Sequence, residues 1–245
     1  MRLAAGTELL DDPAADPVAV RRSLGNIARA NRLFGGTAAV LWGLGKLLKG
    51  RNTICDTRSA DQASRPVFTL LDIGTGAGDI PAAARRWAAA RGIVLRTLGL
   101  ERLRPAAQLA RSAELPVILG CAGALPIRTG GVDLVVISQV LHHLDTAEAE
   151  RLLRDATRIA RVGVVVADLR RSRTAAALFG VASRALGFDV HTREDGITSV
   201  GRGYRRSELE RLCTTAGVRA TVSQRLGWRV VAWWCTGPVL SASKG

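Results

Sequence analysis

Short apolar runs that alternate with helix-like segments dominate residues 67–169, and this alternation constrains the fold more than any other feature. Five such runs predict strands: VFTLLDI (67–73), IVLRTLGL (93–100), LPVIL (115–119), VDLVVIS (132–138) and VGVVVADL (162–169). Helices are expected between them, over about 80–91, from Pro105, and over about 146–160 behind an Asp145–Glu148 capping box. Uninterrupted apolar strands between helices predict an α/β fold whose parallel sheet is covered on both faces.

The C-terminal part departs from this alternation. A capping box of Ser207 and Glu210 predicts a helix that ends near residue 216. Residues 218–235 read as two strands around a Leu226-Gly227 turn. Such a short connection requires antiparallel pairing, so we expect a mostly parallel sheet with one antiparallel C-terminal strand.

The first 65 residues differ from the rest and are predicted to be a helical segment followed by a linker, with the main domain over 66–245. Asp16-Pro17 is typical of a helix start, and residues 51–66 are polar and rich in turn formers. The N-terminal helices could form a lid or cap over a substrate, or pack into the core. A third and least favoured alternative is a basic segment lying on a membrane surface.

Composition narrows the functional classes. With 47% hydrophobic residues the chain can bury a core, which excludes an intrinsically disordered protein. Its four cysteines and three histidines show neither a disulfide framework nor a metal-binding spacing, so no metal is expected. The net charge of +14 raises nucleic acid as a partner, but the arginines are spread along the chain.

No secretory signal is apparent, and the apolar run 33–45 is too short to span a membrane. We therefore expect a cytoplasmic protein without a transmembrane segment.

A glycine-rich loop, Asp72-Ile73-Gly74-Thr75-Gly76-Ala77-Gly78, follows the first strand. Glycines at a strand-to-helix junction let the backbone turn tightly and approach a ligand. The sixth position of a dinucleotide-binding fingerprint would fall on Asp79. An acid there would repel a pyrophosphate, whereas a cofactor with a cationic amino-acid end tolerates it. S-adenosylmethionine (SAM) is such a cofactor.

DIGTGAG resembles motif I of the class I SAM-dependent methyltransferases, and the strand order with its C-terminal hairpin agrees with their seven-stranded Rossmann-like fold. The resemblance implies that Glu101, at the end of the second strand, bonds the ribose hydroxyls. Cys121 stands where the family often has an aspartate that contacts the adenine, so we expect weaker or backbone-mediated recognition there. The implied cofactor-binding residues are Asp72, Gly74, Thr75, Gly76, Gly78, Glu101, Arg102, Cys121, Ala122 and Ser138.

Three further segments resemble narrower groups. VDLVVISQVLHHLD (132–145) is similar to ubiquinone/menaquinone-type small-molecule methyltransferases. VVVADLRRS (164–172) and GRGYRRSEL (201–209) are similar to a bacterial subgroup associated with aromatic polyketide pathways, and thus with secondary metabolism.

Candidate chemistry gathers where the strands end, because ligands of an open α/β sheet bind at the carboxyl ends of its strands. His142 and His143 are candidate bases for a phenol or enol; they are expected to point in different directions, with His143 favoured. Asp168 either contacts the substrate or satisfies nearby arginines. His191 and Tyr204 lie on a long insert after the fifth strand and either contact substrate or pack.

The sequence therefore predicts a SAM-dependent methyltransferase for a small aromatic or apolar acceptor, with O-methylation of a phenolic or quinone-like polyketide favoured. One alternative is an RNA or DNA methyltransferase. Ser138-Gln139-Val140-Leu141 contains neither the Asn/Asp-Pro-Pro-Tyr nor the Pro-Cys motif of such enzymes, and aromatic residues for stacking bases make up only 4%. The other alternative is a non-catalytic binding protein with this fold. A homo-oligomer is compatible with the sequence.

Overall fold

A computed structural model of the protein describes residues 8–12, 14–49 and 65–236. Its centre is a seven-stranded sheet in the order β3-β2-β1-β4-β5-β7-β6. All described strands run parallel except β7, which pairs antiparallel with both β5 and β6, so the expected topology is confirmed. The strands are β1 Val67–Ile73, β2 Val94–Glu101, β3 Val117–Leu119, β4 Val132–Ser138, β5 Ala160–Leu169, β6 Thr221–Arg225 and β7 Arg229–Cys235.

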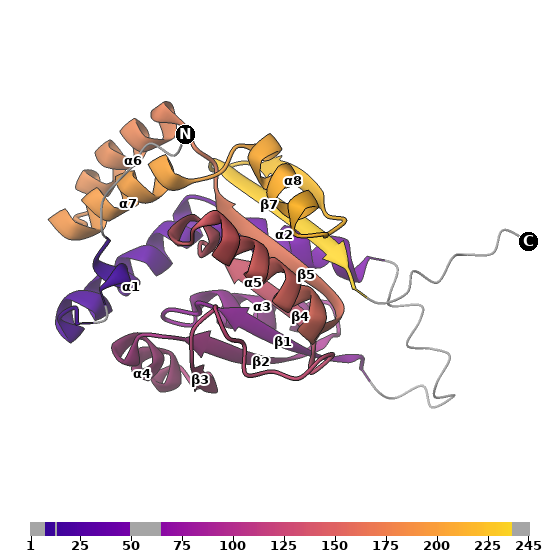
Figure 1. Cartoon of the computed structure of the whole chain (residues 1–245). Coiled ribbons are helices and arrows are strands. Elements are labelled where there is room, and N and C mark those ends of the chain that lie inside the picture. The colour runs from indigo at the N-terminus through magenta and orange to yellow at the C-terminus, as the bar shows by residue number, and fades with distance from the viewer. Residues whose placement is uncertain (1–7, 13, 50–64, 237–245) are drawn as a thin grey trace, which may run out of the picture.

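Helices cover both faces of this sheet (Figure 1). They are α1 Pro17–Leu33, α2 Gly36–Leu48, α3 Asp79–Ala89, α4 Arg104–Ser112, α5 Thr146–Ile159, α6 Arg173–Ala185, α7 Val190–Arg202 and α8 Arg206–Thr215. Two short 3-10 turns, η1 Leu9–Asp11 and η3 Leu141–His143, complete the described elements that shape the site.

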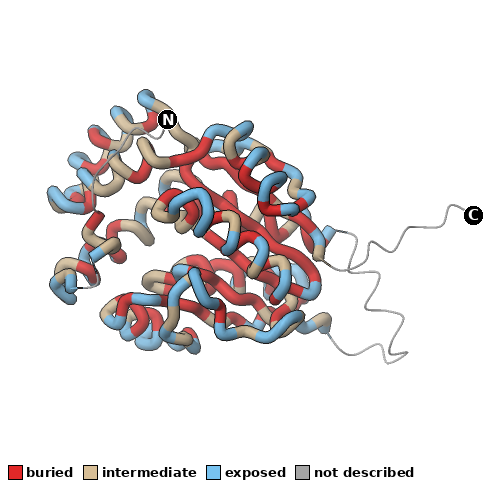
Figure 2. The backbone as a smooth tube through the Cα atoms, in the orientation of Figure 1, coloured by how far each residue is buried: buried red, intermediate tan, exposed pale blue. Residues whose placement is uncertain are grey.

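Two apolar clusters hold these layers together. Helices α5 and α8 pack on one face of the sheet, where Leu152, Leu153 and Leu209 are fully buried. Helices α2 and α3 pack on the other face. Figure 2 shows the strands as an almost continuous buried layer between the helices. Burying such aliphatic side chains stabilises the fold by about 1.5–3 kcal/mol each.

The two helices of the N-terminal segment pack in different places, one in the core and one beside the site end of the sheet. Helix α2 packs against β5 and β7, with Val40 and Leu44 fully buried, which matches the core-packing alternative. Gly35, at φ +77°, turns the chain between α1 and α2. Helix α1 instead packs beside α4 and α7, at the carboxyl end of the sheet. The predicted linker lies outside the described residues except for its last two positions, as does Cys55.

Most of the predicted helix starts are found. Asp16 accepts a hydrogen bond from the backbone N–H of Ala19, and Asp145 and Glu148 form the expected reciprocal capping box. The predicted Ser207–Glu210 box is wrong, because α8 begins at Arg206. Glu208 accepts a hydrogen bond from the backbone N–H of Arg205 at 2.7 Å, and this bond sets the helix start two residues earlier.

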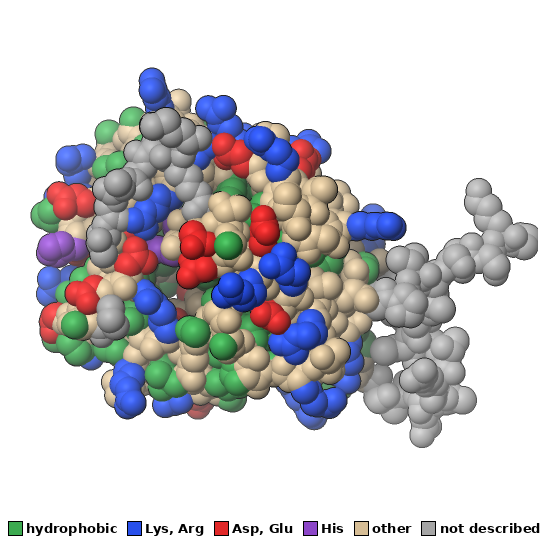
Figure 3. Space-filling model, viewed as in Figure 1, with side chains coloured by type: hydrophobic (Ala, Val, Ile, Leu, Met, Phe, Trp, Pro, Cys, Tyr) green, Lys and Arg blue, Asp and Glu red, His purple; other side chains and the backbone are tan. Residues whose placement is uncertain are grey.

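None of the helices in the described part of the chain has the length and apolar character needed to cross a bilayer. Lys and Arg side chains are scattered over the face seen in Figure 3 and do not form one tract there. This agrees with the spread of arginines along the sequence.

Candidate active site

A cavity of about 930 Å³ lies at the carboxyl ends of β1, β2, β4 and β5. The ends of these strands form its floor. Helices α1, α6 and α7, together with residues 8–11, form its walls and roof. All the predicted cofactor-binding residues except Gly78 line this cavity.

The glycine loop forms the inner wall of the cavity. Gly74, Gly76 and Gly78 have φ values of +71°, +54° and +77°, a region that side chains other than glycine rarely adopt. A Cβ atom on Gly74 would lie 2.6 Å from Val140, and one on Gly76 would lie 3.2 Å from Leu24 of α1. The loop therefore favours glycine for its backbone conformation and, at Gly74, also for space.

Glu101 ties the end of β2 to this loop. Its carboxylate is buried and accepts hydrogen bonds from the backbone N–H groups of Gly76 (2.9 Å), Arg102 (2.8 Å) and Leu103 (3.0 Å). A carboxylate offers about four acceptor positions, so capacity remains for a ligand hydroxyl. The guanidinium of Arg102 donates to the backbone carbonyl of Leu10 and thereby joins this corner to the N-terminal segment.

Two buried oxygen atoms at the loop have no hydrogen-bond partner among the described residues: Oδ1 of Asp72 and Oγ of Ser138. The other oxygen of Asp72 accepts a hydrogen bond from the Thr75 hydroxyl at 2.8 Å. Burial raises the pKa of Asp72 to about 8; the Thr75 hydrogen bond opposes this, and the charges of Asp79 and Glu101 add to it. Buried polar atoms without partners are rare, so this corner fits a ligand that brings a donor or a positive charge.

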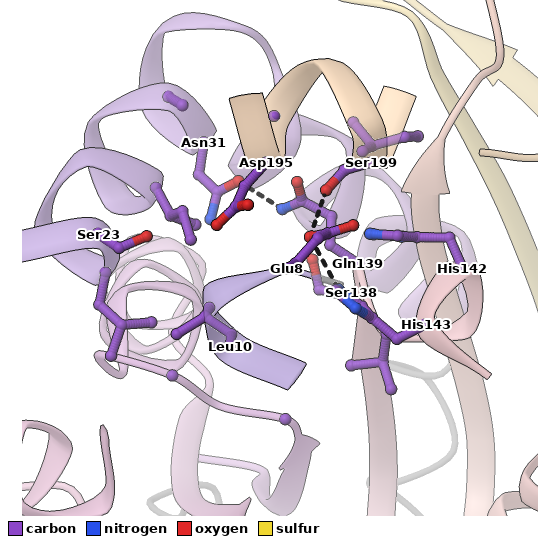
Figure 4. Close-up of a pocket in the computed structure, with 18 of the residues that line it drawn as sticks. Glu8, Leu10, Ser23, Asn31, Ser138, Gln139, His142, His143, Asp195 and Ser199 are labelled. Carbon is purple, nitrogen blue, oxygen red and sulfur yellow. Dashed lines mark hydrogen bonds and ion pairs between the residues drawn. The ribbon is translucent and has the colours of Figure 1, made fainter. Parts of the chain in front are cut away.

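On the far side of the cavity, His142 and His143 lie together, although they were expected to point apart. Their ring centroids are 4.2 Å apart, because η3 turns both rings to the same side. Nδ1 of His142 lies 2.6 Å from Oδ1 of Asp168, and both side chains are almost fully buried. The His142 ring points toward Glu8 (Figure 4).

His143 is held by the N-terminal segment. Its Nδ1 lies 2.9 Å from Oδ1 of Asp11, and its Nε2 lies 3.8 Å from Oε2 of Glu8. Burial alone would lower the pKa of His143, but the Asp11 hydrogen bond and the charges of Glu8, Asp11 and Asp168 outweigh it and raise that pKa.

The family comparison matches the part of the chain that forms the floor of this cavity. Residues 71–167, from β1 to the end of β5, match the family model described as a methyltransferase domain. The chain thus carries a methyltransferase domain over these residues, and its seven-stranded sheet has the fold of the class I SAM-dependent methyltransferases. SAM is accordingly its cofactor, and the partnerless oxygens of Asp72 and Ser138 fit the cationic amino-acid end of that molecule.

Solved structures share the fold of this methyltransferase at low sequence identity. A SAM-dependent methyltransferase of Aquifex aeolicus is 14% identical with a TM-score of 0.55, covering 90% of this chain and 98% of its own. The O-methyltransferase family 2 protein of Planctomyces limnophilus, in complex with apigenin, is 16% identical with a TM-score of 0.56, covering 92% and 63%. PigF with SAH is 19% identical with a TM-score of 0.57, covering 94% and 62%. None of the curated protein sequences matches the chain.

The predicted substrate residues of the methyltransferase lie in different places. Asp168 lies behind His142 and does not line the cavity. Tyr204 is buried and donates a hydrogen bond from its hydroxyl to the backbone carbonyl of Leu141, so it supports the turn that carries the histidines. His191 is exposed on α7 and is not among the residues that line the cavity.

Several lining residues were not predicted from the sequence. Gln139, whose φ of +56° is unusual for a residue with a side chain, donates from Nε2 to Oδ1 of Asn31 at 2.5 Å. Nδ2 of Asn31 donates in turn to Asp79 at 3.0 Å. This chain of hydrogen bonds joins β4, α1 and α3 around the glycine loop, and Figure 4 shows its first link. No local pattern in the sequence pairs residues so far apart.

Glu8 is another residue that lines the cavity and was not predicted from the sequence. It is buried and accepts hydrogen bonds from Ser199 at 2.7 Å and Arg202 at 3.0 Å, both on α7. Glu8, His142 and His143 place possible metal-ligand atoms within 4.8 Å of one another. Both oxygens of Glu8 already accept hydrogen bonds, however, and Arg202 brings a positive charge to the carboxylate. The cluster of Glu8, His142 and His143 is therefore better suited to hydrogen bonding than to holding a metal ion.

The rest of the cavity wall is largely apolar. Phe34, which directly follows α1, contacts Phe179 of α6 with ring centroids 5.7 Å apart, and Leu178 and Val181 also lie on α6. Ile27 and Trp228 add further apolar surface. The cavity thus has a polar end at the glycine loop and an apolar end beneath the α6–α7 cap.

Proposed function

We propose that this methyltransferase methylates a hydroxyl group of a small, largely apolar aromatic molecule, with a phenolic or quinone-like polyketide as the favoured class. One observation carries the proposal: the His142–Asp168 pair stands at the edge of a cavity whose free end is lined by aromatic and aliphatic side chains. An apolar wall with few polar groups suits a ligand of this kind. The apigenin complex of the Planctomyces limnophilus protein, which has the same fold, supports it.

His142 is the proposed general base. SAM supplies an electrophilic methyl group on a sulfonium. Asp168 holds Nδ1 of His142, which leaves Nε2 to take the proton from the acceptor hydroxyl as its oxygen becomes the nucleophile. Asp168 also stabilises the imidazolium that forms, in the way that a buried carboxylate supports a catalytic histidine. Tyr204 fixes the turn that carries the histidine.

His143 is less suited to this role. Its raised pKa favours the protonated form, and Glu8 and Asp11 face its two nitrogens. We assign it the task of holding residues 8–11 over the cavity. This assignment reverses the preference for His143 drawn from the sequence.

The contacts of the N-terminal segment divide it into a cap over the site and a part of the domain core. Helix α1 and residues 8–11 serve as the cap of the site, whereas α2 belongs to the core of the methyltransferase domain. The net charge of +14 favours the nucleic-acid alternative, but the cations on the face in Figure 3 do not form one tract and the acceptor end of the cavity is largely apolar.

The test is a methyl-transfer assay with SAM and matched acceptors. Phenols such as apigenin and hydroxylated naphthoquinones are compared with their amine and thiol counterparts, and products are identified by mass spectrometry. We expect methylation of the hydroxylated compounds, unaffected by EDTA. Product from amines alone, or from RNA or DNA alone, would refute the proposal.

A further inference from the structure

Helix α6 carries an apolar stripe on its outer side. Its exposed positions include Thr174, Ala177, Leu178, Val181 and Ala185, which follow the three- and four-residue spacing of one helical face. Leu178 is 51% exposed and Val181 is 68% exposed. Large aliphatic side chains that repeat along one exposed helical face mark an interaction surface more often than scattered single residues do.

This stripe continues into the active-site cavity. Leu178 and Val181 are exposed and at the same time line the cavity, so they form part of its mouth. Figure 1 shows α6 and α7 projecting beyond the sheet at the end of the molecule where α1 lies. Val190, at the start of α7, is 52% exposed and extends the apolar surface around the α6–α7 turn.

The surroundings of the stripe are basic. Helix α6 contains two arginines, Arg173 and Arg184, and no acid; helix α1 contains four arginines and no acid. Arg29 of α1 reaches this region directly, because its guanidinium donates to the carbonyl of Leu186 and lies over the ring of Phe188. The nearby Asp189 accepts hydrogen bonds from the neutral groups of Asn26 and Thr192, so it stays ionised and offsets one of these arginines. On α7, Arg193 offsets the exposed Glu194.

We propose that the α6 stripe with its flanking arginines docks on an anionic lipid bilayer. Apolar side chains that enter the interface and cations that meet anionic headgroups are the two attractions that hold peripheral proteins there. A second copy of the chain fits less well, because a symmetric dimer through this face would bring the arginines that flank the stripe on one copy close to those on the other. Docking would place the cavity mouth at the bilayer, so that a lipophilic acceptor enters without crossing water. That consequence rests on the proposed function; the docking does not.

The experiment measures partitioning of the full chain onto vesicles without SAM or acceptor, so its outcome is independent of the methyl-transfer assay. Vesicles of phosphatidylcholine alone are compared with vesicles containing about one-third phosphatidylglycerol, at low and moderate salt. We expect binding to the anionic vesicles that weakens as salt rises. The double variant Leu178→Glu/Val181→Glu should bind at least tenfold more weakly.

Val67→Glu is the matched control, because Val67 is 49% exposed at the opposite, amino end of the sheet. It should bind vesicles like the wild type. Binding of S-adenosylhomocysteine by each variant reports that the protein is folded. Absence of vesicle binding by the wild type, or equal binding by the double variant, would overturn the proposal. So would a wild-type dimer in sedimentation analysis that the double variant abolishes.

Discussion

Asp168 and His142 form a buried pair in which Oδ1 of the aspartate lies 2.6 Å from Nδ1 of the imidazole. The same aspartate oxygen accepts the backbone N–H of Leu169 at 2.7 Å, so the carboxylate cannot rotate freely. Burial alone would raise the pKa of Asp168, but the charge and hydrogen bond of His142 and the Leu169 N–H lower it. The aspartate therefore stays ionised and orients the ring.

The first prediction concerns this pair. His142→Ala should lower kcat by about 10²-fold or more, because general-base catalysis contributes about that much. Asp168→Asn should also lower kcat, because an amide can hold the ring in the wrong tautomer. Both variants should bind S-adenosylhomocysteine like the wild type, since neither residue contacts the glycine loop. His143→Gln is the control, and a larger loss of kcat there than in His142→Ala would return the role of base to His143.

A second prediction concerns the glycine loop. Gly76→Arg should abolish binding of S-adenosylhomocysteine in calorimetric titration while leaving the circular dichroism spectrum unchanged. The reason is that Gly76 lines the cavity with φ +54°, and a Cβ on it would already lie 3.2 Å from Leu24, so an arginine side chain would fill the space beside the loop. Gly92→Arg is the matched control, because Gly92 also has positive φ but faces open space. Equal loss of binding in the two variants would assign the effect to backbone strain.

Asp72 leads to a third prediction. Its pKa of about 8 means that the cofactor-free protein holds this proton at neutral pH. An ammonium group placed beside it would favour the carboxylate, so binding should release a proton and strengthen as pH rises toward 8. Titrations at pH 7 in two buffers of different ionisation enthalpy measure that release. Asp72→Asn should abolish it and weaken binding about tenfold, whereas Asp155→Asn, on the remote helix α5, should not.

Rising pH has the opposite effect on the stability of the cofactor-free protein: it strengthens cofactor binding through Asp72 but lowers the contribution of Asp72 to the free energy of unfolding. In the cofactor-free protein the native state keeps the Asp72 proton up to about pH 8, while the unfolded chain loses it near 3.8. The contribution of Asp72 to the free energy of unfolding therefore falls as pH rises through this window. Unchanged proton release in Asp72→Asn would show that another group titrates.

The sequence was informative where the determining contacts are local. The five central strands, the glycine loop and the Leu226-Gly227 turn each follow from a short pattern, and their positions agree within a few residues. The carboxyl ends of the strands converge in any such sheet, so the cofactor half of the site could be predicted as a set. The start of α8 was misplaced because two overlapping capping boxes compete, and Glu208 prevails over Glu210.

The acceptor half was predicted poorly because distant segments build it. Glu8 meets Ser199 across 191 positions, and His143 meets Asp11 across 132. Nothing near Glu8 in the sequence indicates a buried carboxylate. The directions of the two histidine rings depend on η3, a single turn that leaves no periodic signal. Asp168 could be placed at a strand end, but its contact with His142 needed the fold.

Cys121 supports a fourth prediction. It is exposed and lines the cavity, at the position where the family resemblance implies a carboxylate that contacts the adenine amino group. Cys121→Asp should tighten binding of S-adenosylhomocysteine about tenfold, because hydrogen bonds to charged groups contribute about 1.5–3 kcal/mol. Cys121→Ser is the control for removal of the thiol. If the aspartate variant binds no better than the serine variant, the adenine is recognised elsewhere.

The last prediction concerns His143 and the segment that it holds. Because the folded pKa of His143 is raised above its ordinary 6.5, its ion pairs with Glu8 and Asp11 stabilise the segment fully below about pH 6.5. This stabilisation is lost as pH rises through the folded value. Hydrogen exchange at the amides of residues 8–12, corrected for the intrinsic pH dependence of exchange, should therefore show protection falling with rising pH. In His143→Gln the protection should be lower and independent of pH in this range.

His191→Gln is the control, because His191 is an exposed histidine near Asp195; this variant should keep the wild-type profile. A pH dependence that survives in His143→Gln would mean that another group, such as Asp195, controls the protection of residues 8–12.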